Sequence, residues 1–222
     1  MADRLKNGET RQPVQLVIFD LDGTLINAYQ AVYESINFAL TKMGFPKVSA
    51  QTIRRSVGWG DRHLIEKFVG KENLENVLAV YRRHHRYSLK NGTALLPGAL
   101  KLLRQLKKNK YKMAVASNRP TRFSLIILKQ LEIKKYFDYV LCADKLKRGK
   151  PHPEILRKIL AQFDLKPQQA IYVGDMIIDL QAGASARVKT IAVATGSSTK
   201  KELAGYKPYA VISRVDQVRK FL

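Results

Sequence analysis

Residues 16 to 25 read Leu-Val-Ile-Phe-Asp-Leu-Asp-Gly-Thr-Leu, an apolar run of β type that ends at Asp20 and Asp22. Strand alternation puts these carboxylates on the same side while the backbone stays extended, and Gly23 permits a sharp turn after them. One carboxylate can then bind a metal or attack a substrate while its neighbour moves protons. Two turn-forming aspartates at a strand end are the simpler alternative, because aspartate is common in turns.

Three later segments also place polar side chains after an apolar run or in a proline-rich turn. In an open parallel α/β sheet, the carboxyl ends of the strands meet at one edge, where ligands bind. We therefore expect these side chains to converge with Asp20. They are Ser117 and Asn118 after residues 113–116, Lys150 in the sequence Gly-Lys-Pro-His-Pro-Glu, and Asp175 with Asp179 after residues 171–173.

These motifs, in this order, resemble those of the haloacid dehalogenase-like superfamily, in its phosphoglycolate phosphatase-like branch. The resemblance spans residues 15 to about 195. It implies an α/β fold, with a doubly wound, Rossmann-like parallel sheet as the core and a small all-helical cap domain inserted into it.

The chemistry of phosphate esters fits these residue types. A phosphate monoester is negatively charged and repels a nucleophile, so a hydrolase needs cations and donors around the transferring group. Mg²⁺ prefers hard oxygen ligands, for which Asp20 and Asp175 are the expected carboxylates. The resemblance implies that Asp20 is also the nucleophile, forming an aspartyl-phosphate. It further implies that Asp22 gives the metal its backbone carbonyl, while its side chain protonates the leaving alkoxide and then deprotonates the water.

The remaining motif residues have implied roles and simpler alternatives. Ser117 and the backbone amide of Asn118 would hold phosphoryl oxygens beside the turn at Gly23, whereas Ser117 as a helix cap is the alternative. Lys150 would neutralise charge on the nucleophile and the phosphate, or be one more solvated cation. Asp179 would support the metal or its waters, orient Lys150, or act only as a first-turn acid that the helix dipole favours.

The second aspartate narrows the type of reaction. Dehalogenases of this superfamily lack an aspartate at the position of Asp22, and the related transport ATPases carry threonine there. Asp22 therefore favours a phosphatase or a phosphomutase, and nothing marks protection of an intermediate from water. We expect hydrolysis of a small phosphorylated metabolite, with phosphoglycolate first among the substrates. Inorganic pyrophosphatase and sugar phosphomutase are the alternatives within the superfamily.

Strand and helix patterns alternate along the core and change in the insert. Between residues 28 and 95 the apolar spacing is helical and no strand pattern occurs. We expect a core domain of residues 1–27 and 96–222 and a cap domain of residues 28–95. The predicted strands are residues 15–19, 112–116, 139–141, 170–173 and 190–193, with 210–212 as a candidate sixth, and the predicted helices are 98–108, 121–131, 153–162 and 176–186.

One cap segment is the best candidate for a substrate loop. It carries Arg55, then Trp59 between Gly58 and Gly60. Its Val-Gly-x-Gly pattern resembles the corresponding segment of phosphoglycolate phosphatases, where a small anionic substrate would favour an arginine. The alternative is that the glycines join two cap helices and Trp59 packs internally.

Charge raises a hypothesis from another class. The chain has 40 Lys and Arg residues against 18 Asp and Glu, a formal net charge of +22, and its pI is about 10.1. Such a domain attracts polyanions through counterion release, so a basic protein that binds nucleic acid or another polyanion is the alternative. The cations are scattered and no known nucleic-acid motif occurs, which makes specific nucleic-acid binding the weaker hypothesis.

Cysteine use and hydropathy indicate the setting. The single cysteine, Cys142, offers no disulfide framework and lies in an apolar run. No 18-residue apolar stretch occurs, and the first ten residues contain no hydrophobic region typical of a signal peptide. We expect a cytoplasmic protein with no membrane span.

Overall fold

A computed structural model of the chain describes residues 13–222, so the predictions about the first ten residues lie outside the described part. Its main sheet is parallel, with the strand order β5-β4-β1-β6-β7-β8. The strands are β1 (Leu16–Phe19), β4 (Lys112–Ser117), β5 (Tyr139–Cys142), β6 (Ala170–Gly174), β7 (Lys189–Val193) and β8 (Ala210–Ile212). This arrangement confirms the predicted doubly wound α/β core, and the predicted strands agree with these bounds to within one residue at each end.

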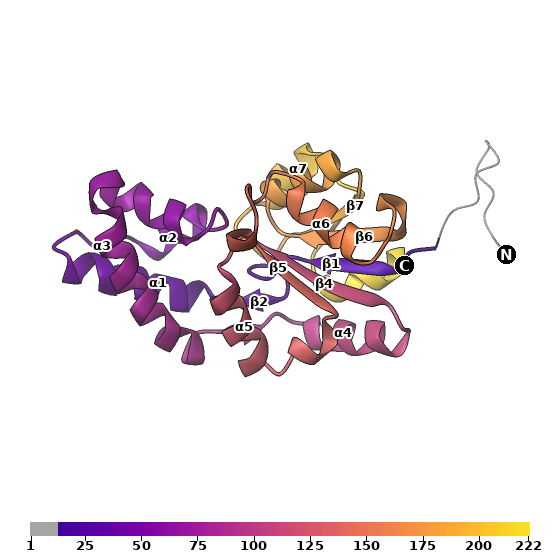
Figure 1. Ribbon diagram of the computed structural model, residues 1–222, viewed down its shortest axis with the longest axis horizontal. Helices are drawn as coiled ribbons and strands as arrows, with labels where there is room; N and C mark the ends of the chain where they lie inside the picture. Colours follow the sequence, from indigo (N-terminus) through magenta and orange to yellow (C-terminus); the bar gives the residue numbers. More distant parts are fainter. Residues whose placement is uncertain (1–12) are drawn as a thin grey trace.

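Helices cover both faces of this sheet (Figure 1). Alternate residues of β1 enter opposite layers: Val17 and Phe19 pack in the cluster with α4, α5 and the C-terminal η4, whereas Leu16 and Ile18 pack with α6 and α7. The covering helices are α4 (Ala99–Lys108), α5 (Thr121–Gln130), α6 (Glu154–Gln162) and α7 (Ile177–Ala186), with α8 (Lys200–Gly205) near the β7–β8 edge. Short 3₁₀ turns are η1 (Lys134–Tyr136), η2 (Ala143–Lys145), η3 (Pro167–Gln169) and η4 (Val215–Phe221).

The order of the strands positions the site. Strand β1 lies between β4 and β6, and the chain runs outward from β1 in both directions. The carboxyl ends of these three neighbouring strands therefore form a crevice at the point where the strand order reverses, which is where open α/β sheets bind ligands.

The insert after β1 forms a helical layer with its own apolar cluster, to one side of the sheet in Figure 1. Its helices are α1 (Tyr29–Lys42), α2 (Ala50–Ser56) and α3 (Asp61–Asn91). Helix α3 is interrupted at Gly70, whose φ of 73° and ψ of 176° are not helical. Ile36, Leu40 and Leu78 are among the buried residues of this cluster, in agreement with the helical spacing of the sequence.

The expectation of an insert without strands is wrong at its end. Strands β2 (Ile26–Asn27) and β3 (Ala94–Leu95) pair antiparallel where the chain leaves and re-enters the core. Two residues per strand are too few to show an alternation in the sequence, so the pattern could not reveal them. Across residues 13–222, no helix is both long and apolar enough to cross a bilayer.

Candidate active site

The turn after β1 brings Asp20 to the crevice. The backbone N–H of Asp20 donates to the carbonyl of Val173 at 2.9 Å, which extends the pairing with β6 by one residue. The chain then turns at Gly23, whose φ is 79° and where a Cβ atom would lie 2.4 Å from Oδ2 of Asp175. Only glycine fits both the positive φ and this close approach, so the turn sits directly on Asp175.

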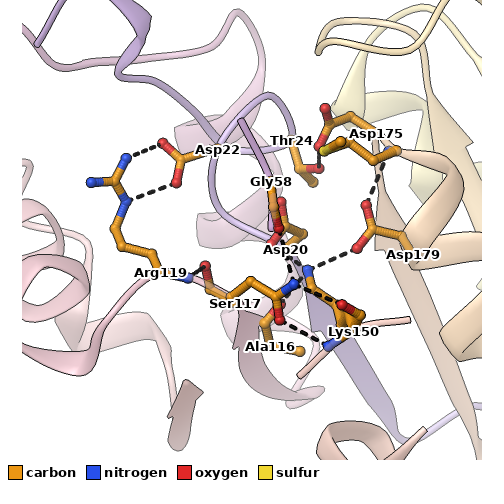
Figure 2. Close-up of polar contacts among 12 residues, drawn as sticks. Asp20, Asp22, Thr24, Gly58, Ala116, Ser117, Arg119, Lys150, Asp175 and Asp179 are labelled. Carbon is orange, nitrogen blue, oxygen red and sulfur yellow. Dashed lines mark hydrogen bonds and ion pairs between the residues drawn. The ribbon is translucent and has the colours of Figure 1, made fainter. Parts of the chain in front are cut away.

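Lys150 is the hub of the polar network (Figure 2). Its Nζ donates to Oδ1 of Asp20 at 2.7 Å, to Oδ1 of Asp179 at 2.8 Å, and to the carbonyl of Ala116 and the hydroxyl of Tyr172, both at 3.0 Å. Burial lowers the pKa of Lys150, but the carboxylates of Asp179 and Asp20 outweigh it and raise this pKa above its usual value. The side chain is 2% exposed, which excludes the alternative of a solvated cation.

Asp179 does more than complement the dipole of α7. Its Oδ1 accepts from Lys150 and, at 2.5 Å, from the hydroxyl of Tyr172, while its Oδ2 accepts from the N–H of Met176 at 3.0 Å. The carboxylate is buried. Asp179 therefore orients Lys150 and at the same time closes the first turn of the helix.

Three buried carboxylates form a group that could hold a cation. Asp20, Asp175 and Asp179 each offer one oxygen, and these oxygens lie within 4.8 Å of one another. Asp175 also accepts from the Thr24 hydroxyl at 3.1 Å and from the Ser197 N–H at 3.3 Å. These contacts orient Asp175 toward the group, and Lys150 alone supplies positive charge to it among the described side chains bonded to the three carboxylates.

The pKa values of Asp20 and Asp175 are raised, as expected for buried carboxylates that share a single cation. Burial, reinforced by Asp20 and Asp179, raises the pKa of Asp175 well above its usual range. Burial also raises the pKa of Asp20 to about 7, although Lys150 pulls it down. A divalent cation bound to these oxygens would hold the carboxylates ionised, and carboxylate oxygens are the ligands that Mg²⁺ prefers. The donor set therefore fits Mg²⁺.

Asp22 points away from this group and binds Arg119 (Figure 2). Nε and Nη2 of Arg119 donate to the two oxygens of Asp22 at 2.8 and 2.7 Å. Nη1 of Arg119 donates to Nε2 of His85 in α3, at 2.7 Å. Burial and the charge of Arg119 lower the pKa of His85 to about 2, so its ring is neutral and can accept this bond. The second aspartate is thereby tied to the helical insert.

Ser117 and Asn118 hold the neighbouring loops. Oγ of Ser117 accepts from the N–H of Arg119 at 3.2 Å and does not cap α5, whose first N–H, that of Thr121, donates to Oδ1 of Asp144 at 3.0 Å. The Asn118 side chain accepts from the Lys150 N–H at 2.8 Å, and it donates at 2.9 Å to the carbonyls of Lys150 and Gly58. Asn118 thus joins the second and third motifs to the loop after α2.

The candidate substrate loop lines the pocket with its glycines and not with the side chains of Arg55 or Trp59. Gly58 and Gly60 line the pocket. The Arg55 side chain is 52% exposed and bonds Ser197 and Glu202, outside the pocket lining. Trp59 is 46% exposed, beside the ring of His63, so it does not pack internally either.

A small pocket lies between the strand ends and the helical insert. Water-sized molecules can reach about 70 Å³ of it, which is room for a small ligand since one water needs roughly 10–15 Å³. Sequence patterns did not single out Arg119, although it directly follows the second motif, or the insert residues Tyr29 and Leu64, which also line the pocket. The lining joins the motif residues Asp20, Asp22, Ser117, Asn118, Lys150 and Asp179 to Tyr29, Val32, Asp61, Leu64, Tyr81, Arg119 and Phe123, among others.

Known proteins are similar to this chain in sequence and in fold. A family model described as haloacid dehalogenase-like hydrolase matches residues 17–193. The phosphoglycolate phosphatase of Psychrobacter arcticus is 34% identical over 205 residues, which cover 87% of this chain and 89% of that protein. Phosphoglycolate phosphatase 1 of Pseudomonas aeruginosa is 29% identical over 215 residues, 93% of this chain and 78% of that protein. The crystal structure of a predicted phosphoglycolate phosphatase from Haemophilus somnus has a TM-score of 0.84 at 27% identity, covering 94% of this chain and 97% of that chain.

Proposed function

The chain belongs to the haloacid dehalogenase-like hydrolase family, and on this premise we propose that it is a Mg²⁺-dependent phosphatase of small phosphate monoesters. One observation carries the proposal. Asp20, at the end of β1, is bonded to the buried cation Lys150 and belongs to a group of three carboxylates, two of which, Asp20 and Asp179, line a small pocket. A nucleophile, a fixed cation and oxygen ligands for a metal are the parts that phosphoryl transfer requires.

In the first step, a carboxylate oxygen of Asp20 attacks phosphorus. The new Asp20 oxygen–phosphorus bond forms as the bond to the leaving oxygen breaks, and Asp22 gives a proton to that leaving oxygen. Lys150, bonded to Asp20, fixes the orientation of the nucleophile and offsets its charge. In the second step, water attacks phosphorus, Asp22 takes its proton, and the bond to Asp20 breaks.

The phosphoryl group needs donors, and the strand ends supply them. We assign Ser117 and the backbone amide of Asn118 to its oxygens, beside the tight turn at Gly23. Asp20, Asp175 and Asp179, with the backbone carbonyl of Asp22, would hold Mg²⁺. When bound, Mg²⁺ supplies positive charge that stabilises the transferring phosphoryl group.

We propose that the helical insert is a separate cap domain, residues 28–95, on a core of residues 1–27 and 96–222. Its own apolar cluster supports this division, as does the β2–β3 ribbon at the boundary. The phosphoryl site recognises only phosphate, so the choice of substrate and the exclusion of water fall to residues that the cap brings to the pocket.

Phosphoglycolate is the substrate we propose first. The names of the relatives support it, because proteins similar over most of this chain are phosphoglycolate phosphatases. The size of the pocket also supports a leaving group of only a few atoms. Neither pyrophosphatase nor phosphomutase has a matching observation in its favour.

The test is phosphate release from a panel of esters in the presence of Mg²⁺. The panel includes phosphoglycolate, pyrophosphate, a hexose phosphate and a nucleoside monophosphate. We expect phosphoglycolate to be hydrolysed fastest, and both EDTA and the Asp20→Asn substitution to abolish release. A protein that releases phosphate from none of these compounds, or equally well after either treatment, would contradict the proposal.

A further inference from the structure

Arg119 is the one cation of the pocket that the phosphoryl chemistry does not use. Among the described residues that line the pocket, only Lys150 and Arg119 carry positive charge. Lys150 is committed to the nucleophile and to Asp179. Arg119 instead binds Asp22 of the core and His85 of the helical insert. A ligand with a second anionic group would therefore meet Arg119.

The guanidinium of Arg119 is already arranged to bind a carboxylate. It holds both oxygens of Asp22, at 2.8 and 2.7 Å, in the forked geometry that arginine and carboxylate favour. The neutral ring of His85 accepts a third N–H and so fixes the guanidinium plane. A guanidinium has five N–H groups, and these three contacts leave two without a partner among residues 13–222.

The pairing also poses a problem for the reaction. Both oxygens of Asp22 accept from Arg119 and the side chain points away from Asp20 (Figure 2), yet the proposed mechanism requires Asp22 to reach the leaving oxygen. Asp22 must therefore leave the guanidinium in each catalytic cycle. A buried arginine left without an anion is costly, so release is favoured when another anion takes the place of Asp22.

The other residues that line the pocket favour the replacement of Asp22 by an anionic ligand. Val32, Leu64 and Phe123 line the same pocket, and apolar walls strengthen the attraction between a cation and an anionic ligand. Asp61, the acidic residue of the insert in this lining, is neutralised by Arg82, whose Nε and Nη2 donate to its carboxylate at 2.7 and 2.9 Å. An incoming anion therefore meets little repulsion from this side.

We propose that Arg119 recognises a carboxylate on the leaving group of the substrate. The substrate carboxylate takes the guanidinium from Asp22, and the freed Asp22 side chain turns to the bridging ester oxygen. Arg119 is thus the residue that determines specificity for short phosphate esters of hydroxy acids. This inference rests on the proposed phosphatase function and names its substrate class.

The test compares two esters of nearly equal size that differ in one group. Phosphoglycolate has a carboxylate where 2-hydroxyethyl phosphate has a neutral hydroxymethyl group. The quantity measured is the ratio of their kcat/KM values for the wild type, Arg119→Gln, Arg119→Lys and Arg104→Gln. Arg104 is exposed on α4 and does not line the pocket, so Arg104→Gln controls for the loss of one positive charge.

We expect Arg119→Gln to lower this ratio roughly 10- to 100-fold, the range for a lost hydrogen bond to a charged group. The ratio falls because only phosphoglycolate carries the carboxylate that Arg119 binds. Arg119→Lys keeps the positive charge but cannot donate to both carboxylate oxygens in the geometry of a guanidinium, so it should give an intermediate ratio. Arg104→Gln should leave the ratio unchanged.

The ratio also separates recognition from a structural role. Both esters are assayed on the same sample, so a smaller folded fraction cancels in the ratio. An unchanged ratio in Arg119→Gln, or loss of both activities in the Gln and Lys variants alike, would overturn the inference and leave the proposed function standing. A wild type that hydrolyses neither ester would instead overturn the proposed function and the inference with it.

Discussion

Lys150 Nζ lies 2.7 Å from Oδ1 of Asp20, although the two residues are 130 positions apart in the sequence. The same Nζ is 2.8 Å from Asp179, so one buried cation serves two buried carboxylates. Its removal leaves both carboxylates without a cation, although Asp179 still accepts from the Tyr172 hydroxyl and the Met176 N–H. We therefore expect Lys150 to matter for stability as well as for activity.

Lys150→Met should lower the free energy of unfolding by about 3–5 kcal/mol at pH 7, the cost of uncompensated buried charge. It should also lower kcat by roughly 100-fold or more, since a fixed charge at the reacting group is lost. Urea denaturation and phosphate release measure the two effects. Lys145→Met, at an exposed lysine, is the matched control and should change neither. A stable, active Lys150→Met protein would refute the role of Lys150 as the hub.

Mg²⁺ should stabilise the protein, because it relieves the repulsion within the group of Asp20, Asp175 and Asp179. At 100 times its Kd the ion contributes about 2.7 kcal/mol, equivalent to a rise in Tm of about 5–10 °C for a chain of this size. Differential scanning fluorimetry with and without Mg²⁺ measures the rise. Asp175→Asn should remove it, whereas Glu72→Gln, at an exposed acid, should retain it. An equal rise in both variants would place the metal elsewhere.

His85 should make stability depend on pH. Its pKa is lowered to about 2 in the folded protein, so between pH 2 and 6.5 the unfolded chain binds a proton that the folded chain does not. The contribution of His85 is therefore present above pH 6.5 and is lost as the pH falls, by about 2 kcal/mol at pH 5.

The comparison of wild type with His85→Gln isolates this effect. Glutamine keeps an acceptor for Arg119 but does not titrate. The contributions of all other titrating groups to the pH dependence of stability are shared by the two proteins, so they cancel when the proteins are compared. The wild type should lose about 2 kcal/mol more than the variant between pH 7 and pH 5 in urea denaturation. Equal losses would mean that His85 is protonated in the folded protein and does not accept from Arg119.

Substitution of Gly58, which lies where the insert meets the core, should lower activity. A Cβ atom there would lie 2.2 Å from Sδ of Met176, and the φ of 104° disfavours other residues. Gly58→Ala should lower kcat/KM by roughly 10- to 100-fold, because the loop that seals the pocket is displaced. The assay is phosphate release at limiting substrate.

Gly44→Ala is the matched control for Gly58→Ala. Gly44 also has a positive φ, 78°, but nothing lies within 4 Å of its Cβ position, so it shares the backbone strain without the clash. Adding Met176→Ala to Gly58→Ala should restore part of the activity. If Gly44→Ala were as damaging as Gly58→Ala, the contact with Met176 would not be the cause.

The core was predictable because parallel strands buried on both faces are short apolar runs, and three of these runs, those of β1, β4 and β6, end in a polar motif. Asp20 and Asp175 follow such runs directly, so topology alone brings them to one edge. The bounds of the strands differ from the prediction by at most one residue for the same reason. The β2–β3 ribbon is too short to leave a pattern.

The partners of Asp22 were not predictable from the pattern. His85 lies 34 residues before Arg119, in a helix whose sequence periodicity shows burial but not the residue it meets in the core. Likewise, the sequence around the end of α2 does not show which residues face the pocket. Gly58 and Gly60 line it, whereas Arg55 bonds Ser197 and Glu202. Contacts between the insert and the core depend on tertiary packing, which local sequence does not encode.

The most direct test of the central claim is to trap the covalent intermediate on Asp20. The protein is mixed with phosphoglycolate and Mg²⁺, quenched in acid within the first turnovers, digested and mapped by mass spectrometry; the Asp22→Asn variant, which should hydrolyse the intermediate slowly, is run in parallel. The account predicts one added phosphoryl group on the peptide that contains Asp20, and none in Asp20→Asn. Phosphate release with Asp20 unmodified throughout, and retained in Asp20→Asn, would contradict it.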